Sequence, residues 1–231
     1  MHFIAIFLLL MAFGFIILGM GLFDVHCHLL PGIDDSKAKW EELESIFQVY
    51  SDCGLDGICF TPHLYNPYVK TDVMGIREAF ARAAKIANRV GLQATIGSEV
   101  FVDKLMKVKV LPIMGKYGLI EFNTQNAPLQ LLEKVHSVLP LRPMIAHVER
   151  YSWLEPESAI ISVMRDMGCI FQVNGKALKP GSKAERYVEA GIVDVLASDC
   201  HGNTADIVAL AEALGSHPEI IQKMRQLGLS R

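Results

Sequence analysis

Seven short runs of β-branched and other apolar residues alternate with helical patterns along this 231-residue chain, and the alternation restricts the fold more than any other feature. The predicted strands are 22–28, 57–63, 93–100, 118–122, 143–148, 170–175 and 193–199. Apolar residues at helical spacing predict helices over 37–54, 72–91, 128–139, 157–168, 182–190, 203–214 and 217–227. Such alternation predicts a parallel sheet covered by helices. Seven units in a chain of this length favour a small α/β barrel over an open sheet.

Ionisable side chains occupy the ends of five of the predicted strands. They are His26, His28, His63, Glu99, His147, Asp199 and His201. The C-terminal strand ends of an α/β barrel meet at one mouth, so we expect these side chains to converge there. Side chains alternate along a strand, and therefore His26 and His28 should project to one side, as should Asp199 and His201.

A metal cluster explains this convergence better than a set of independent structural histidines. A single histidine is usually a hydrogen-bonded core or loop residue, but five of the eight histidines here lie at predicted strand ends. Burying so many polar groups without partners is costly. Imidazole and carboxylate ligands without thiolate favour Zn, Mn or Fe. The number of ligands requires two or three ions, with Glu99 as a candidate bridge, whereas Asp24 lies deeper and is expected to orient a ligand.

Residues 3–23 form an apolar segment without a charge. Its length can span a bilayer, so a membrane anchor is one interpretation. An export signal is a second, although no Lys or Arg precedes the segment and no A-x-A site follows it. A third is that the protein starts at Met20, because a bilayer helix would run into the first strand with almost no linker. The chain is therefore divided into a leader, 1–21, and a barrel domain, 22–231.

The charge and the cysteines restrict the partners and the compartment. A net charge of −3 and a pI near 6.2 leave no basic footprint, so nucleic acid is not an expected partner. The five cysteines form no CxxC pair, and three lie in apolar strand-like runs. This usage is typical of reduced thiols, and we expect a cytoplasmic protein, with membrane association through residues 3–23 left open.

Five ordered motifs, "DVHCHLLPGIDD", "TPH", "GSE", "IAHVER" and "ASDCH", resemble those of the PHP (polymerase and histidinol phosphatase) superfamily. The chain is most similar to the metal-dependent protein-tyrosine phosphatases of bacterial capsule and exopolysaccharide operons, over about residues 22–215. The resemblance implies a distorted (β/α)7 barrel, preceded here by the apolar segment, with two or three divalent ions, manganese favoured. It also implies phosphotyrosine proteins as substrates, such as a tyrosine autokinase of polysaccharide export.

The resemblance assigns roles to individual residues. The implied metal ligands are His26, His28, Asp35, His63, Glu99, His147, Asp199 and His201. Arg150 is implied to contact the substrate phosphate and, with Asp199, to be catalytic. The chain departs from the family pattern at Asp206, where a second phosphate-binding arginine is common, and Arg165, Arg186 or Lys176 are candidates to replace it.

Two other functions remain open at this point. The motifs do not separate a protein-tyrosine phosphatase from a small-molecule phosphatase such as one acting on histidinol phosphate. The apolar segment and Asp206 are also compatible with a membrane-tethered, non-catalytic barrel, although the complete set of eight ligands favours an enzyme.

Overall fold

The structure, a computed structural model, describes residues 21–102, 109–138 and 140–230. Its strands are β1 Phe23–Cys27, β2 Gly57–Phe60, β3 His63–Leu64, β4 Gln93–Ile96, β5 Glu99–Phe101, β6 Tyr117–Glu121, β7 Arg142–Ile145, β8 Ile170–Asn174 and β9 Val195–Ala197. Its α-helices are α2 Leu43–Asp52, α3 Ile76–Arg89, α4 Leu131–His136, α5 Ala159–Asp166, α6 Lys183–Glu189, α7 Thr204–Ser216 and α8 Pro218–Gln226. Two short 3-10 helices follow β7 and β8, namely η1 Val148–Arg150 and η2 Gly175–Ala177. The predictions for the leader fall almost wholly on residues 1–20, outside the described residues.

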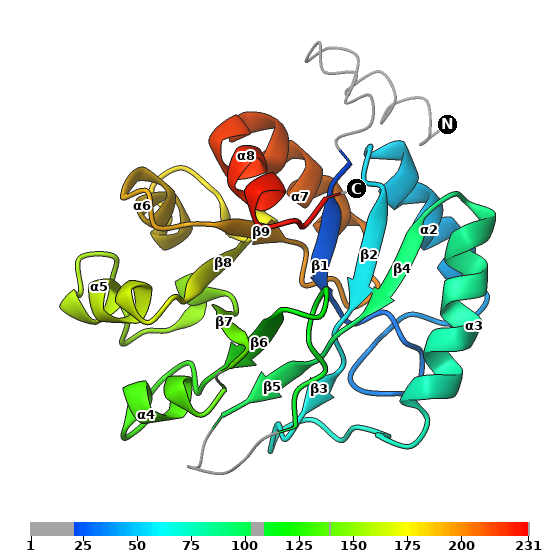
Figure 1. Ribbon diagram of the computed structural model, residues 1–231. Coiled ribbons are helices and arrows are strands. Elements are labelled where there is room, and N and C mark those ends of the chain that lie inside the picture. The colour runs from blue at the N-terminus through cyan, green and yellow to red at the C-terminus, as the bar shows by residue number, and fades with distance from the viewer. Residues whose placement is uncertain (1–20, 103–108, 139, 231) are drawn as a thin grey trace.

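The strands form a curled parallel sheet in two parts, with helices on its outer side (Figure 1). One part has the order β1-β2-β4 and the other β3-β5-β6-β7-β8-β9, and every pairing is parallel. The predicted α/β class is therefore confirmed.

Two of the seven predicted strands are each broken in the middle. The run 57–63 becomes β2 and β3, and the run 93–100 becomes β4 and β5. Pro62 lies in the first break, where it cannot donate a ladder hydrogen bond. Backbone bonds cross the breaks, from Gly97 N to Phe60 O at 2.8 Å and from Glu99 N to Pro62 O at 3.2 Å. The sheet thus bends between its two parts while the chain keeps its direction.

The first strand also lies beside the end of the last one. Asp199 N donates to His26 O at 2.9 Å and His28 N donates to Cys200 O at 2.8 Å. A parallel bridge joins Cys27 to Cys200. These bonds bring the two ends of the curled sheet together at the carboxyl ends of the strands, on the side where the predicted ligands lie.

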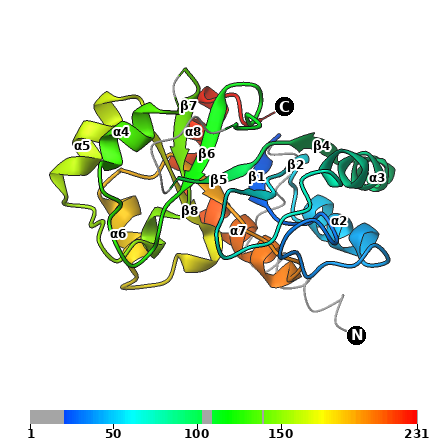
Figure 2. The ribbon, with the colours of Figure 1, turned by 90° about the horizontal axis from the view of Figure 1, so that it is seen from below.

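The helices pack around the sheet (Figure 2), and the largest difference from their predicted bounds is at the start of α2. Its buried face is Leu43, Ile46, Phe47 and Tyr50. The predicted start at residue 37 is wrong, because α2 begins at Leu43. The segment before it is bonded to the loop after β9, since Lys37 N donates to His201 O at 2.8 Å. Over the described ranges, no helix has both the length and the hydropathy to cross a bilayer.

Candidate metal centre

All eight predicted ligands converge at the carboxyl ends of the strands. His26 lies in β1 and His28 directly follows it, while His63 begins β3 and Glu99 begins β5, each just after a break. The other four lie in the segments that follow β1, β7 and β9, and they are Asp35, His147, Asp199 and His201. Ligand atoms gather into three overlapping groups within 4.8 Å: His28, Asp35, His63 and His201; His26, His28 and Asp199; and His63, Glu99 and Glu121. His147 joins them through Glu99, whose Oε1 lies 2.9 Å from its Nε2.

The hydrogen bonds around His26 fix its tautomer. Gln172 Oε1 accepts the backbone N–H of His147 at 2.7 Å, which identifies that atom as the amide oxygen. The same oxygen lies 3.1 Å from His26 Nδ1, so Nδ1 must carry the proton. The lone pair of His26 Nε2 is therefore directed into the cluster.

His28 has the same orientation for a similar reason. Its Nδ1 donates to Asp34 Oδ2 at 2.9 Å, and that carboxylate oxygen also accepts His63 N at 3.2 Å. A ring nitrogen that donates to a carboxylate leaves the other nitrogen free to bind a metal. His28 Nε2 therefore also directs a lone pair into the cluster.

When both imidazoles are neutral, as metal binding requires, three acceptor atoms consequently face one another without a proton between them. The Nε2 atoms of His26 and His28 are 3.2 Å apart, and Glu99 Oε2 lies 3.3 and 3.2 Å from them. This carboxylate oxygen is fully buried and has no hydrogen-bond donor among the described residues. Such an arrangement is unfavourable unless a cation occupies the centre. The donor set therefore fits a divalent metal ion, with nitrogen and oxygen ligands and no thiolate.

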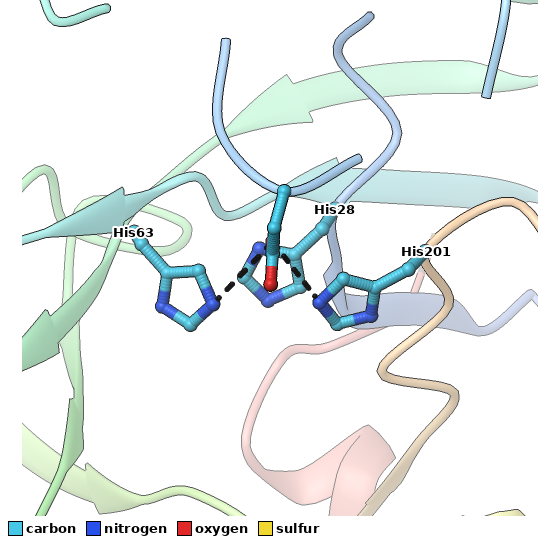
Figure 3. A group of neighbouring side chains, drawn as sticks. His28, His63 and His201 are labelled. Atoms are coloured by element: carbon cyan, nitrogen blue, oxygen red, sulfur yellow. Dashed lines mark ion pairs between the residues drawn. The ribbon is translucent and has the colours of Figure 1, made fainter. Parts of the chain in front are cut away.

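A second group consists of His28, His63 and His201 (Figure 3) together with Asp35. Asp35 Oδ1 lies 3.8 Å from His63 Nε2 and 3.3 Å from His201 Nε2. The ring of His28 stacks between these two imidazoles, with centroid distances of 4.2 and 4.3 Å. Because the two groups share His28, ions bound in them would be close neighbours.

The third group contains Glu121, a residue that the sequence analysis missed. It ends β6, and its Oε1 lies 3.1 Å from His63 Nδ1, while Oε2 lies 3.8 Å from His147 Nε2. Asn66 donates to the same Oε1 at 2.7 Å. A sequence feature pointed to it, because Glu121 is the penultimate residue of the apolar run 118–122, as Glu99 and His147 are in their predicted strands.

Two of the ligand candidates lie on unusual backbone. His147 and Asp199 each follow their strand by two residues, with φ of 32° and 50°. Asp199 and His201 were predicted to project to the same side because side chains alternate along a strand. That reason is wrong, because β9 ends at Ala197, before either residue. The left-handed turn brings Asp199 Oδ1 to 3.7 Å from His201 Nδ1 instead.

Asp24 lies behind the cluster, as its position in β1 predicts. It is fully buried and accepts hydrogen bonds from the Tyr50 hydroxyl at 2.8 Å and from Ser198 N at 3.0 Å. A longer bond of 3.4 Å reaches His26 N. Burial raises the pKa of Asp24, although these hydrogen bonds oppose the shift. Its carboxylate ties β1 to the end of β9 and supports the backbone of the ligands.

Burial and charge act in opposite directions on the ionisable groups. Burial would raise the pKa of Glu99 and of Asp199, but the surrounding imidazoles outweigh it and lower both. Burial would lower the pKa of His28, but hydrogen bonds to Asp34 and Glu99 hold it well above the ordinary value. The pKa of Asp35 is lowered to about 2, chiefly by its hydrogen bond with His201. The metal-free cluster thus retains protons on imidazole beside ionised carboxylates.

Two cavities open onto the cluster. One, of about 510 Å³, is lined by Asp35, Lys37, Arg150, Asn174, Lys176, Asp199, His201, Asn203 and Asp206. Arg150 is half-exposed there, and its Nη1 lies 3.3 Å from Asp199 Oδ2. The other, of about 250 Å³, shares Arg150 and Asp199 and has aromatic walls formed by Tyr68, Phe101 and Phe122.

Of the three cations considered as replacements for a second arginine, one lines a cavity. Lys176 Nζ lies 3.3 Å from Asp206 Oδ2. Arg165 donates to the carbonyls of Gly191 and Ile192, and Arg186 pairs with Glu155, in both cases away from the cluster.

The chain matches a known protein family and is similar to several known proteins. Residues 22–223 match the family described as "Capsular polysaccharide synthesis, CpsB/CapC". The tyrosine-protein phosphatase CpsB of Streptococcus pneumoniae is 30% identical over 201 residues, which cover 78% of this chain and 83% of the relative. The solved metal-dependent tyrosine phosphatases YwqE of Bacillus subtilis and CpsB of S. pneumoniae are matched with a TM-score of 0.68 at 25% identity, over 87% of this chain and 90% of the other. The histidinol phosphate phosphatase of Lactococcus lactis shares the fold, with a TM-score of 0.53 at 14% identity, over 85% and 93% of the two chains.

Proposed function

The chain belongs to the CpsB/CapC family of capsular polysaccharide synthesis, and from this premise we propose that it is a metal-dependent protein-tyrosine phosphatase. The observation that carries the proposal is the buried meeting of His26 Nε2, His28 Nε2 and Glu99 Oε2, three acceptors that require a cation. Its relatives, by their names, are tyrosine phosphatases, which supports phosphotyrosine as the group that is hydrolysed.

The proposed ligands fall into three sets. His26, His28, Glu99 and Asp199 would hold one ion; Asp35, His63 and His201 a second; and His147 and Glu121 a third, with Glu99 reaching between them. When bound, divalent ions would supply positive charge for the phosphoryl oxygens and lower the pKa of water. Manganese is the ion we favour.

The chain's own residues would position the phosphate. Arg150 extends over the cluster from η1, and its guanidinium can donate two parallel hydrogen bonds to phosphate oxygens. Its contact with Asp199 Oδ2 aims the guanidinium at the side of the cluster where the larger cavity opens. Negative charge that spreads over the phosphoryl oxygens during hydrolysis would therefore meet a fixed positive charge.

The aromatic cavity would hold the tyrosine ring. Tyr68 is 76% exposed, and its ring makes an edge contact with Phe101 at a centroid distance of 6.1 Å. An aromatic ring placed between these side chains would leave its phosphate over the cluster, because both cavities share Arg150 and Asp199. Tyr68→Ala is expected to raise KM for a phosphotyrosine peptide by about fivefold, since an aromatic pair contributes about 1 kcal/mol.

The finer features of the protein are proposals of the same kind. The bonds from β1 to the end of β9 support a distorted (β/α)7 barrel, with β2 and β3, and β4 and β5, each counted as one strand. A tyrosine autokinase of polysaccharide export is the substrate protein we favour, in the cytoplasm. The family's connection with capsule synthesis supports both.

The test measures phosphate release from a phosphotyrosine peptide and from histidinol phosphate by the full chain with added Mn²⁺. Preference for the peptide is expected, and His63→Ala or Asp199→Ala should abolish turnover. Preference for histidinol phosphate would refute the substrate class. Near-wild-type turnover in either alanine variant would refute the cluster as the catalytic centre.

A further inference from the structure

A lysine reaches the larger cavity because one short segment packs directly on a helix. Gly175, at the start of η2, lies against α7, and a β-carbon there would be 2.6 Å from Leu210 Cα. Since that neighbour is backbone and cannot move aside, only glycine permits this approach. The next residue, Lys176, is thereby placed beside the first turn of α7, which contains Asp206.

The ammonium of Lys176 is held by two oxygens at the edge of the metal cluster. Its Nζ donates to Asp206 Oδ2 at 3.3 Å and to the carbonyl oxygen of Asp199 at 3.2 Å. The carboxylate of the same Asp199 accepts Arg150 Nη1 at 3.3 Å. Two cations from different strand ends therefore flank one residue of the cluster, and both line the same cavity.

Three lysine and arginine side chains line the cavity, Lys37, Arg150 and Lys176, and Lys176 is the one that pairs with Asp206. Asp35 and Asp199 are proposed metal ligands, so their charges are directed to the ions. Asp206 remains as an uncoordinated carboxylate, and alone it would repel a phosphate. Lys176 is 37% exposed, with three N–H donors and two partners among the described residues, so one donor remains for a bound ligand.

We infer that Lys176 is the second phosphate-binding cation of this site, opposite Arg150, with Asp206 as the counter-ion that holds its ammonium at the cavity. The inference rests on the proposed phosphatase function. It assigns the substrate phosphate a place between Arg150 and Lys176, over the cluster. Phosphate then shares the ammonium with Asp206, whose negative charge weakens the affinity while its carboxylate orients the cation.

The test is the affinity of the metal-loaded full chain for inorganic phosphate, measured by titration calorimetry. Lys176→Met should weaken binding about tenfold, the loss expected for one charge-assisted hydrogen bond. Lys176→Arg should stay within about threefold of the wild type, because it keeps the charge. Asp206→Asn should bind phosphate about threefold more tightly, because the competing charge is removed.

Lys179→Met is the matched control, because it removes the same charge from an exposed position outside the cavity. It should leave phosphate affinity unchanged. Equal losses in Lys176→Met and Lys179→Met, or no loss in either, would overturn the inference, as would weaker binding in Asp206→Asn. Metal content and the urea unfolding midpoint of each variant identify changes due to folding. Turnover of the phosphotyrosine peptide by the wild type separates the two proposals. Absence of turnover refutes the proposed function. Turnover together with an unchanged phosphate affinity in Lys176→Met refutes only the role of Lys176.

Discussion

Gln172→Leu should weaken metal binding although Gln172 is not itself a ligand. The side chain is fully buried in β8, and its Oε1 accepts from His26 Nδ1 and His147 N. Leucine has a similar volume but leaves His26 without the acceptor that fixes its tautomer. Loss of such a partner typically costs about 10- to 100-fold in metal affinity, or about 1.4–2.8 kcal/mol. The unpaired N–H of His147 should also lower the unfolding free energy of the metal-free protein by about 1–3 kcal/mol.

Competition between the protein and a chelating indicator for Mn²⁺ measures the first effect, and urea unfolding after metal removal measures the second. Gln48→Leu is the matched control, because Gln48 is exposed on α2 and its side chain donates to Asp52 within the same helix. It should change neither quantity. If Gln172→Leu binds Mn²⁺ within about twofold of the wild type, the deduced tautomer of His26 does not contribute to the site.

Three further predictions follow from buried groups. Asp24→Ala removes the buried carboxylate that accepts from the Tyr50 hydroxyl and from Ser198 N, and it should lower the unfolding free energy by about 3 kcal/mol, measured in urea; a change below about 1 kcal/mol would contradict it. Gly175→Ala places a methyl group 2.6 Å from Leu210 Cα and should cost about 1–3 kcal/mol; an unchanged thermal midpoint would show that η2 is not in close contact with α7. The raised pKa of His28 stabilises the metal-free protein below the ordinary value of 6.5, and this is lost as pH rises through the folded-state pKa. Metal must displace that proton, so affinity should increase from about pH 6 to about pH 8, with proton release in calorimetry; a pH-independent affinity would refute the assignment.

The sequence predicted the chemistry of the cluster better than its geometry. Strand-end positions identified seven residues that the fold brings together, because parallel strands end at a common edge, and the family resemblance added Asp35. Glu121 was missed, although it lies next to the last position of the predicted strand 118–122 and ends β6. Gln172 and Asn174 carry no charge, and their hydrogen bonds join segments distant in the sequence, so no local pattern could indicate them. The breaks between β2 and β3 and between β4 and β5 also depend on the bend of the whole sheet, which no local sequence pattern shows.

The supporting network follows from the position of β8 between β7 and β9. Gln172 and Asn174 are two residues apart, so their side chains share one face of the strand and bond to each other at 2.8 Å. Gln172 then holds His147 N beyond the end of β7, and Asn174 Nδ2 holds Asp199 Oδ2 at 3.0 Å beyond the end of β9.

Those two neighbours are the ligand candidates with left-handed backbone, a conformation that costs about 1–3 kcal/mol at a residue other than glycine. The turn directs each side chain back over the strand ends, where an extended backbone would carry it past the cluster. One face of one strand therefore stabilises the strained turns on both sides of it. We infer that the strain is retained because the two turns bring His147 to Glu99, and Asp199 to His26 and His28, within the same metal cluster.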